Sequence, residues 1–67
     1  MAVAKVIEIS SASSESFEEA IKQGLARATK TVHDIRGAWI KEQNVRLENG
    51  KIVEFRVDMK VTFILED

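Results

Sequence analysis

The chain has 67 residues, of which 45% are apolar and 31% charged, and its formal net charge is −1. Charges of both signs nearly cancel, so the chain has no long-range electrostatic field of one sign, which argues against nucleic acid or an anionic membrane as partner. No apolar run reaches the roughly 18 residues of a membrane span. We therefore expect a cytoplasmic protein. We predict one domain, residues 1–67, and a domain this small buries only about 60% of the surface that its unfolded chain exposes. Because the chain has no cysteine, no disulfide can stabilise it, and we expect oligomerisation to do so.

The first half of the sequence predicts a strand followed by a helix. Residues 3–9 are mostly β-branched or apolar, which favours a strand. In the serine-rich segment that follows, Ser13 or Ser14 can cap a helix whose first turn is acidic. Apolar residues at three- and four-residue steps predict this helix from about Ser14 to about Val32. We expect Gly24, in its middle, to allow the helix to approach a sheet closely.

The second half predicts a long hairpin, with strands over residues 35–47 and 53–65. Asn49 and Gly50 favour a two-residue type I′ turn between them. Every second residue from Val53 to Leu65 is apolar, which is typical of a strand with one buried and one exposed face. Counting outward from the turn predicts the register: Glu48 with Lys51, Arg46 with Val53, Val45 with Glu54, Asn44 with Phe55, Gln43 with Arg56, Glu42 with Val57, Lys41 with Asp58, Ile40 with Met59, Trp39 with Lys60, Ala38 with Val61 and Gly37 with Thr62.

These elements predict an α+β fold of the β-α-β-β type, in which a three-stranded antiparallel sheet packs on one helix. A right-handed crossover places the last strand between the other two. The predicted helix is about 28 Å long, whereas the last strand runs about 43 Å. We therefore expect the turn end of the hairpin to project past the helix and to contact another copy of the chain.

Taken together, the sequence from Lys5 to Asp67 resembles the dodecin family. The resemblance is carried by segments that occur in the same order and at the same spacing: residues 5–9, the helix entrance at Ser13, residues 20–21 and 24–28, Thr31, Asn49-Gly50, Phe55, residues 59–61, Phe63 and residues 65–66. It implies a subunit of a hollow homododecamer that stores or sequesters flavin, riboflavin or FMN, without catalysing a reaction.

The residues that bind flavin in that family do not all match. The position of its stacking tryptophan falls on Gly37, the glutamine at the ring edge falls on Arg56, and two basic positions fall on Asn44 and Ile64. Trp39 lies on the same strand face as Gly37 but about 7 Å further along. The resemblance thus implies an altered flavin site built from five residues: Trp39, Arg56, Gln43, Gly37 and Lys41.

Alternatives remain open at each of these positions. Trp39 either stacks on a planar ligand or packs across a subunit interface beneath Lys60. Arg56 either binds a ligand phosphate or carboxylate, or pairs with a neighbour such as Glu54.

The chain as a whole could also be a shell that has lost flavin. Such a shell could hold a calcium or magnesium ion where five carboxylates meet across a symmetry axis: Glu8, Asp34, Glu42, Glu54 and Asp58. No metal site is assigned within one chain. His33 is the only histidine, and no spacing indicates a catalytic group, so we expect no enzyme.

Overall fold

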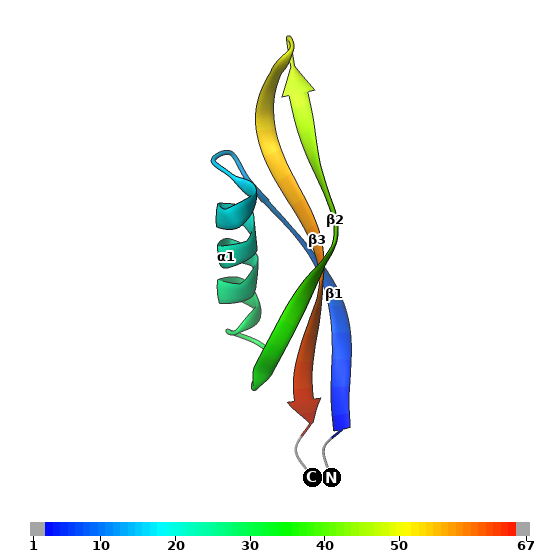
Figure 1. Ribbon diagram of the computed structural model, residues 1–67. Coiled ribbons are helices and arrows are strands. Elements are labelled where there is room, and N and C mark those ends of the chain that lie inside the picture. Colours follow the sequence, from blue (N-terminus) through cyan, green and yellow to red (C-terminus); the bar gives the residue numbers. More distant parts are fainter. Residues whose placement is uncertain (1–2, 66–67) are drawn as a thin grey trace.

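The computed structural model describes residues 3–65, in four elements: β1 (Val3–Ser13), α1 (Phe17–Ala28), β2 (Ile35–Glu48) and β3 (Lys51–Leu65). The sheet order is β1-β3-β2 with antiparallel neighbours, and α1 lies against one face of the sheet (Figure 1). The predicted α+β fold and strand order are confirmed. The predicted domain, residues 1–67, also includes Met1, Ala2, Glu66 and Asp67, which lie outside the described residues. Among residues 3–65, no helix is long and apolar enough to cross a membrane.

The helix is shorter than predicted at both ends, and β1 is longer than predicted. Residues 10–13 stay in the sheet, where Ser10 pairs with Asp58 and Ser13 with Phe55. The N-cap is Ser16, whose Oγ accepts a hydrogen bond from the Glu19 N–H at 2.9 Å, so the prediction of a cap at Ser13 or Ser14 is wrong. At the other end α1 stops at Ala28, four residues before the predicted Val32.

The core lies between α1 and the middle of β3. Ala20, Val57 and Met59 are fully buried. Partly buried apolar side chains surround them: Ile9, Phe17, Ile21 and Leu25. A Cβ placed on Gly24 would lie 2.8 Å from Met59 Cε and 2.9 Å from Ser11 Cβ. The predicted close approach of helix and sheet at Gly24 is therefore confirmed.

The observed register of the hairpin agrees with the predicted register next to the turn and again from Ile40 to Gly37. It differs in the segment between these two regions. Glu48 pairs with Lys51 and Trp39 with Lys60, as predicted. Between them, Val53 and Lys41 are bulged residues that shift the pairing by one position. The observed pairs there are Arg46 with Glu54, Val45 with Phe55, Asn44 with Arg56, Gln43 with Val57 and Glu42 with Asp58. The six predicted pairs of residues 41–46 are wrong.

The two bulges change which side chains of β2 lie on the side of α1. The counted register would have placed Glu42, Asn44 and Arg46 opposite Val57, Phe55 and Val53, on the face that packs against α1. With the bulges, Val45 lies opposite Phe55 and Gln43 opposite Val57 on this face. Glu42, Asn44 and Arg46 lie on the other face of the sheet.

The sheet is much longer than the helix that covers it. Twelve residues of α1 span about 18 Å, whereas the fifteen residues of β3 span about 50 Å. As predicted, the turn end of the hairpin projects past the helix (Figure 1). Among residues 3–65, seven large apolar side chains are left exposed in one copy: Val3, Val6, Trp39, Ile40, Leu47, Ile52 and Leu65.

Candidate functional site

Four of the five predicted site residues reach the face of the sheet opposite α1, which we call the open face. Residues that are register partners present their side chains on the same face of a sheet. Trp39 and Lys60 are partners, as are Gly37 and Thr62, and Arg56 and Asn44. These positions alternate with Val57, Met59 and Val61, which are fully buried on the side of α1.

Gln43 does not join them. Its register partner is Val57, which is fully buried against the helix side, so Gln43 belongs to the opposite face of the sheet. The prediction that Gln43 lies beside Arg56 is wrong. The cause is the bulge at Lys41, because one extra residue reverses the face of every side chain that follows until the next bulge.

Trp39 is the most prominent aromatic group on the open face. Its side chain is 50% exposed, and the Lys60 ammonium lies 5.8 Å from the ring centroid, as the register predicted. A lysine at this distance is attracted to the face of an indole. A planar ligand that stacked on this side of the ring would have to displace Lys60.

Gly37, at the position of the family's stacking tryptophan, lies in open space. A Cβ added there would meet no atom within 4 Å. The backbone therefore does not require glycine at this position. Gly37 offers room on the surface beside Trp39, but it presents no group that could hold a ring.

Lys41 pairs with β1 instead of β3. Its ammonium lies 3.2 Å from Glu8 Oε2, in an ion pair that spans the sheet above β3. The predicted pair of Lys41 with Asp58 is therefore wrong. The bulge takes Lys41 out of register, so Asp58 faces Glu42.

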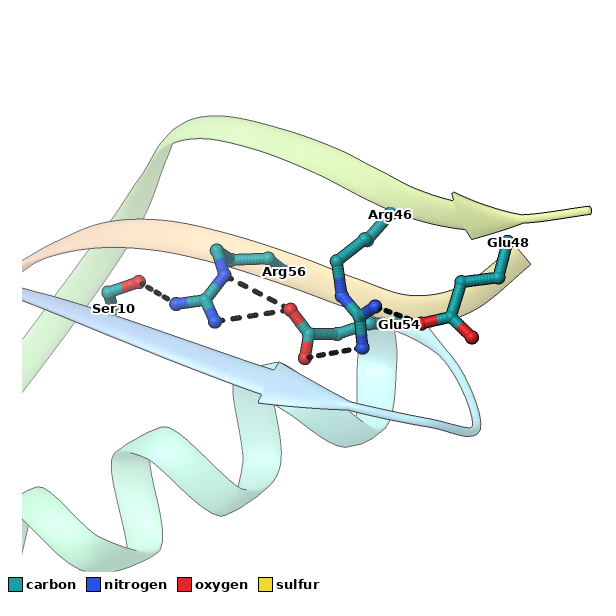
Figure 2. Close-up of polar contacts among 5 residues, drawn as sticks. All are labelled: Ser10, Arg46, Glu48, Glu54 and Arg56. Carbon is teal, nitrogen blue, oxygen red and sulfur yellow. Dashed lines mark hydrogen bonds and ion pairs between the residues drawn. The ribbon is translucent and has the colours of Figure 1, made fainter. Parts of the chain in front are cut away.

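Arg56 takes part in a chain of polar contacts that crosses all three strands (Figure 2). Its Nε and Nη2 donate to Glu54 Oε2 at 3.3 and 3.1 Å, and its Nη1 donates to Ser10 Oγ at 3.2 Å. Arg46 continues the chain, with Nη2 3.9 Å from Glu54 Oε1 and Nη1 2.6 Å from Glu48 Oε2.

The partners of Arg56 bear on its role. Pairing with Glu54 was one of the two alternatives, and the structure shows it. All three guanidinium nitrogens donate within the protein. A ligand phosphate would have to compete with a carboxylate that already neutralises the arginine.

Two carboxylates of the open face lie side by side without a cation. Glu42 and Asp58 are register partners on adjacent strands, and neither forms an ion pair with any of residues 3–65. Like charges directly opposite each other destabilise a sheet. The pair is a set of oxygen ligands of the kind that a hard cation such as calcium prefers.

The other three carboxylates predicted for a cation all have partners. Glu8 pairs with Lys41, Glu54 with two arginines, and Asp34 with Arg36, whose hydrogen bond holds the pKa of Asp34 below its ordinary value. Within residues 3–65, no group of three or more His, Cys, Asp or Glu side chains is gathered to hold a metal ion. A complete site would need further ligands from other copies or from water.

Comparisons with known proteins agree with this fold. A family model described as Dodecin matches residues 3–66. The calcium dodecin of Mycobacterium tuberculosis is 35% identical over 63 residues, which cover 94% of this chain and 89% of that protein. A crystal structure of a calcium dodecin from the same organism, described as having a novel calcium-binding site, matches 96% of this chain and 91% of its own with a TM-score of 0.82 and 37% identity. A single-residue mutant of the Thermus thermophilus dodecin is similar over 100% of both chains, with 33% identity and a TM-score of 0.95.

Proposed function

Because the chain belongs to the dodecin family, we propose that it is a non-enzymatic homododecamer that binds a divalent cation, calcium, on the open face of its sheet. Glu42 and Asp58 are the proposed ligands. The observation that carries this proposal is the direct pairing of these two carboxylates without a neutralising side chain in the described part of the chain. We also propose that the protein is located in the cytoplasm.

Calcium chemistry fits this arrangement. Calcium takes six to eight oxygen ligands in flexible geometries, so two carboxylates supply only part of a site. In a symmetric assembly every side chain near an axis is repeated, which brings further carboxylates to one place. The calcium dodecin of Mycobacterium tuberculosis resembles this chain over more than nine tenths of its length, both in sequence and in its crystal structure, and its name supports the choice of ion.

The test is to titrate metal-free protein with calcium and to measure the heat of binding by calorimetry and Tm by thermal unfolding. We expect heat of binding and a rise in Tm, because a ligand that binds only the folded state stabilises it by about 2.7 kcal/mol at a hundred times its Kd. Glu42→Gln should abolish the rise. Without calcium the same variant should be more stable than the wild type by about 0.2–1 kcal/mol, because the carboxylates no longer repel each other.

The matched control is Glu8→Gln. Glu8 is a carboxylate of the same face that already has a cation, Lys41, at 3.2 Å. This variant should keep the calcium-dependent rise in Tm. If the wild type gives neither heat nor a shift, or if Glu42→Gln still responds fully, calcium binding at this pair is wrong.

A flavin, riboflavin or FMN, is the second candidate ligand, and the half-exposed indole of Trp39 is the observation that favours it. Three features weaken it: Lys60 lies over the ring, Gly37 offers no stacking group, and Arg56 is neutralised by Glu54. Adding riboflavin to the same metal-free protein separates the candidates. Quenching of riboflavin fluorescence that is lost in Trp39→Leu would favour flavin.

A further inference from the structure

Arg56 lies between two carboxylates of its own strand. Glu54 and Asp58 are each two residues away, and because side chains alternate along a strand, all three lie on the open face at steps of about 7 Å. Arg56 Nη2 lies 3.1 Å from Glu54 Oε2, whereas none of the ion pairs within residues 3–65 joins Arg56 to Asp58. The arginine thus pairs with only one of two carboxylates that are equally far along β3.

The reach of the side chain does not explain this choice. Other arginines of the chain pair with carboxylates two residues away, in both directions. Arg36 Nε lies 2.7 Å from Oδ1 of the preceding Asp34, and Arg46 Nη1 lies 2.6 Å from Oε2 of the following Glu48. A guanidinium that turned forward from Arg56 would therefore arrive at the carboxylate of Asp58.

Three hydrogen bonds hold the guanidinium of Arg56 where it is (Figure 2). Nε and Nη2 donate to Glu54 Oε2 at 3.3 and 3.1 Å, and Nη1 donates to Ser10 Oγ at 3.2 Å. Glu54 is itself held from the other side, since Arg46 Nη2 lies 3.9 Å from its Oε1. Its side chain is only 25% exposed, so salt screens its charge less than that of an exposed carboxylate. Glu54 is therefore a fixed and favourable partner for Arg56.

The cation on the other side of Asp58 also has a different partner. Lys60 follows Asp58 by two residues on the same face. Its ammonium lies 5.8 Å from the ring centroid of Trp39 and forms no ion pair within residues 3–65. Asp58 thus has a cationic neighbour on each side along β3 and pairs with neither, which leaves it and Glu42 available to a metal ion.

We propose that Glu54 is a positioning residue of the calcium site: it binds the guanidinium of Arg56 and so keeps this cation away from Asp58. The inference rests on the proposed function, because it concerns the same pair of carboxylates, Glu42 and Asp58. An arginine paired with Asp58 would neutralise one of the two ligands, and calcium would have to displace it. Glu54 is not a ligand itself and acts only through Arg56.

The test is a cycle of two substitutions, in which the Kd for calcium is measured by calorimetry at physiological ionic strength. Glu54→Gln keeps a hydrogen-bond acceptor but loses the charge, so Arg56 should turn to Asp58, the remaining carboxylate within reach. We expect the Kd to rise about two- to fivefold, the factor that corresponds to an exposed ion pair. In an Arg56→Gln background the same change should leave the Kd unaltered, because no arginine is left to move.

The matched control is Glu48→Gln. It removes the charge of a carboxylate that also pairs with an arginine two residues away, Arg46, but at the end of the polar contacts that is remote from Asp58. This variant should keep the wild-type Kd for calcium.

A second measurement needs no metal. In urea unfolding with a chelator present, Asp58→Asn should raise the midpoint of the wild type, because it removes the repulsion between Asp58 and Glu42. In the Glu54→Gln background it should raise the midpoint less or lower it, because it then also removes a pair with Arg56. Equal shifts in both backgrounds would show that Arg56 does not turn to Asp58.

The outcomes distinguish this inference from the proposed function. If the wild type binds calcium but Glu54→Gln leaves the Kd unchanged, Glu54 does not position Arg56 for the site. If Glu54→Gln raises the Kd equally with and without Arg56, the cause is a general loss of negative charge. In both cases the inference is wrong and the calcium site stands. If the wild type binds no calcium, both are wrong.

Discussion

At the scale of single residues, the packing of α1 on the sheet depends on the missing side chain of Gly24. A Cβ there would lie closer to Met59 and Ser11 than van der Waals contact allows. Met59 Cε is the end of a flexible side chain and can move, but Ser11 Cβ is held by β1. Gly37 is the opposite case, because nothing lies within 4 Å of the same added atom.

These two glycines give a matched pair of substitutions. We expect Gly24→Ala to destabilise the protein by about 1–3 kcal/mol through overpacking, reduced by up to about 1 kcal/mol from the better helix propensity of alanine. Gly37→Ala should be neutral or stabilise by about 0.5–1 kcal/mol, because glycine is unfavourable inside a strand. Midpoints of urea unfolding measure both. Equal midpoints for the two variants would show that the contact at Gly24 is not close.

At the scale of elements, the hairpin combines the bulges at Val53 and Lys41 with a chain of ion pairs on its open face. The bulges turn Arg46 outward, so that Arg46 and Arg56 flank Glu54 from β2 and β3. Glu54 is the central member, with a side chain only 25% exposed. Glu48, at the end of the chain, is 62% exposed and contacts Arg46 alone.

Replacing the central carboxylate should therefore matter more than replacing the outer one. We expect Glu54→Gln to lower the free energy of unfolding by about 1 kcal/mol or somewhat more, because both arginines lose the negative charge that they share. Glu48→Gln should change it by less than about 0.5 kcal/mol, as is usual for exposed pairs. Urea unfolding at low and high salt measures the difference, which should shrink as salt screens the charges. If both variants lose the same stability, the chain of contacts does not act as a unit.

At the scale of the whole molecule, one copy has a small core and a long sheet. In the part of the chain that the structure describes, seven large apolar side chains are exposed and five apolar ones are buried: Ala20, Ala28, Val57, Met59 and Val61. The longest extent of the molecule is 52 Å and the shortest only 13 Å. So thin a chain buries little of its own apolar surface, and the proposed contact between copies would add to its stability.

Stability should therefore depend on protein concentration. We expect Tm to rise as the protein is concentrated and the fraction of folded monomer to be small at every concentration, because assembly and folding are coupled. Differential scanning calorimetry over a wide dilution series, with light scattering on the same samples, measures this. A Tm that stays constant while the mass falls to that of one chain would mean that the protomer is stable alone.

The sequence alone determined the elements and their order. The alternation from Val53 to Leu65, the turn at Asn49-Gly50 and the spacing of the helix are local patterns, and each predicted its element correctly. The strand order followed from the handedness of the crossover. Even the contact between Lys60 and Trp39 was predictable, because the two bulges between the turn and Trp39 compensate each other.

Only the tertiary structure decided which side chains share a face. A bulge has no clear local signal in this sequence, and nothing near Val53 or Lys41 marks them as the residues that leave the register. That change removed Gln43 from the candidate site, separated Lys41 from Asp58 and brought Glu42 and Asp58 together. Pairing along a strand depends on what each face must bury, and burial is a property of the folded chain.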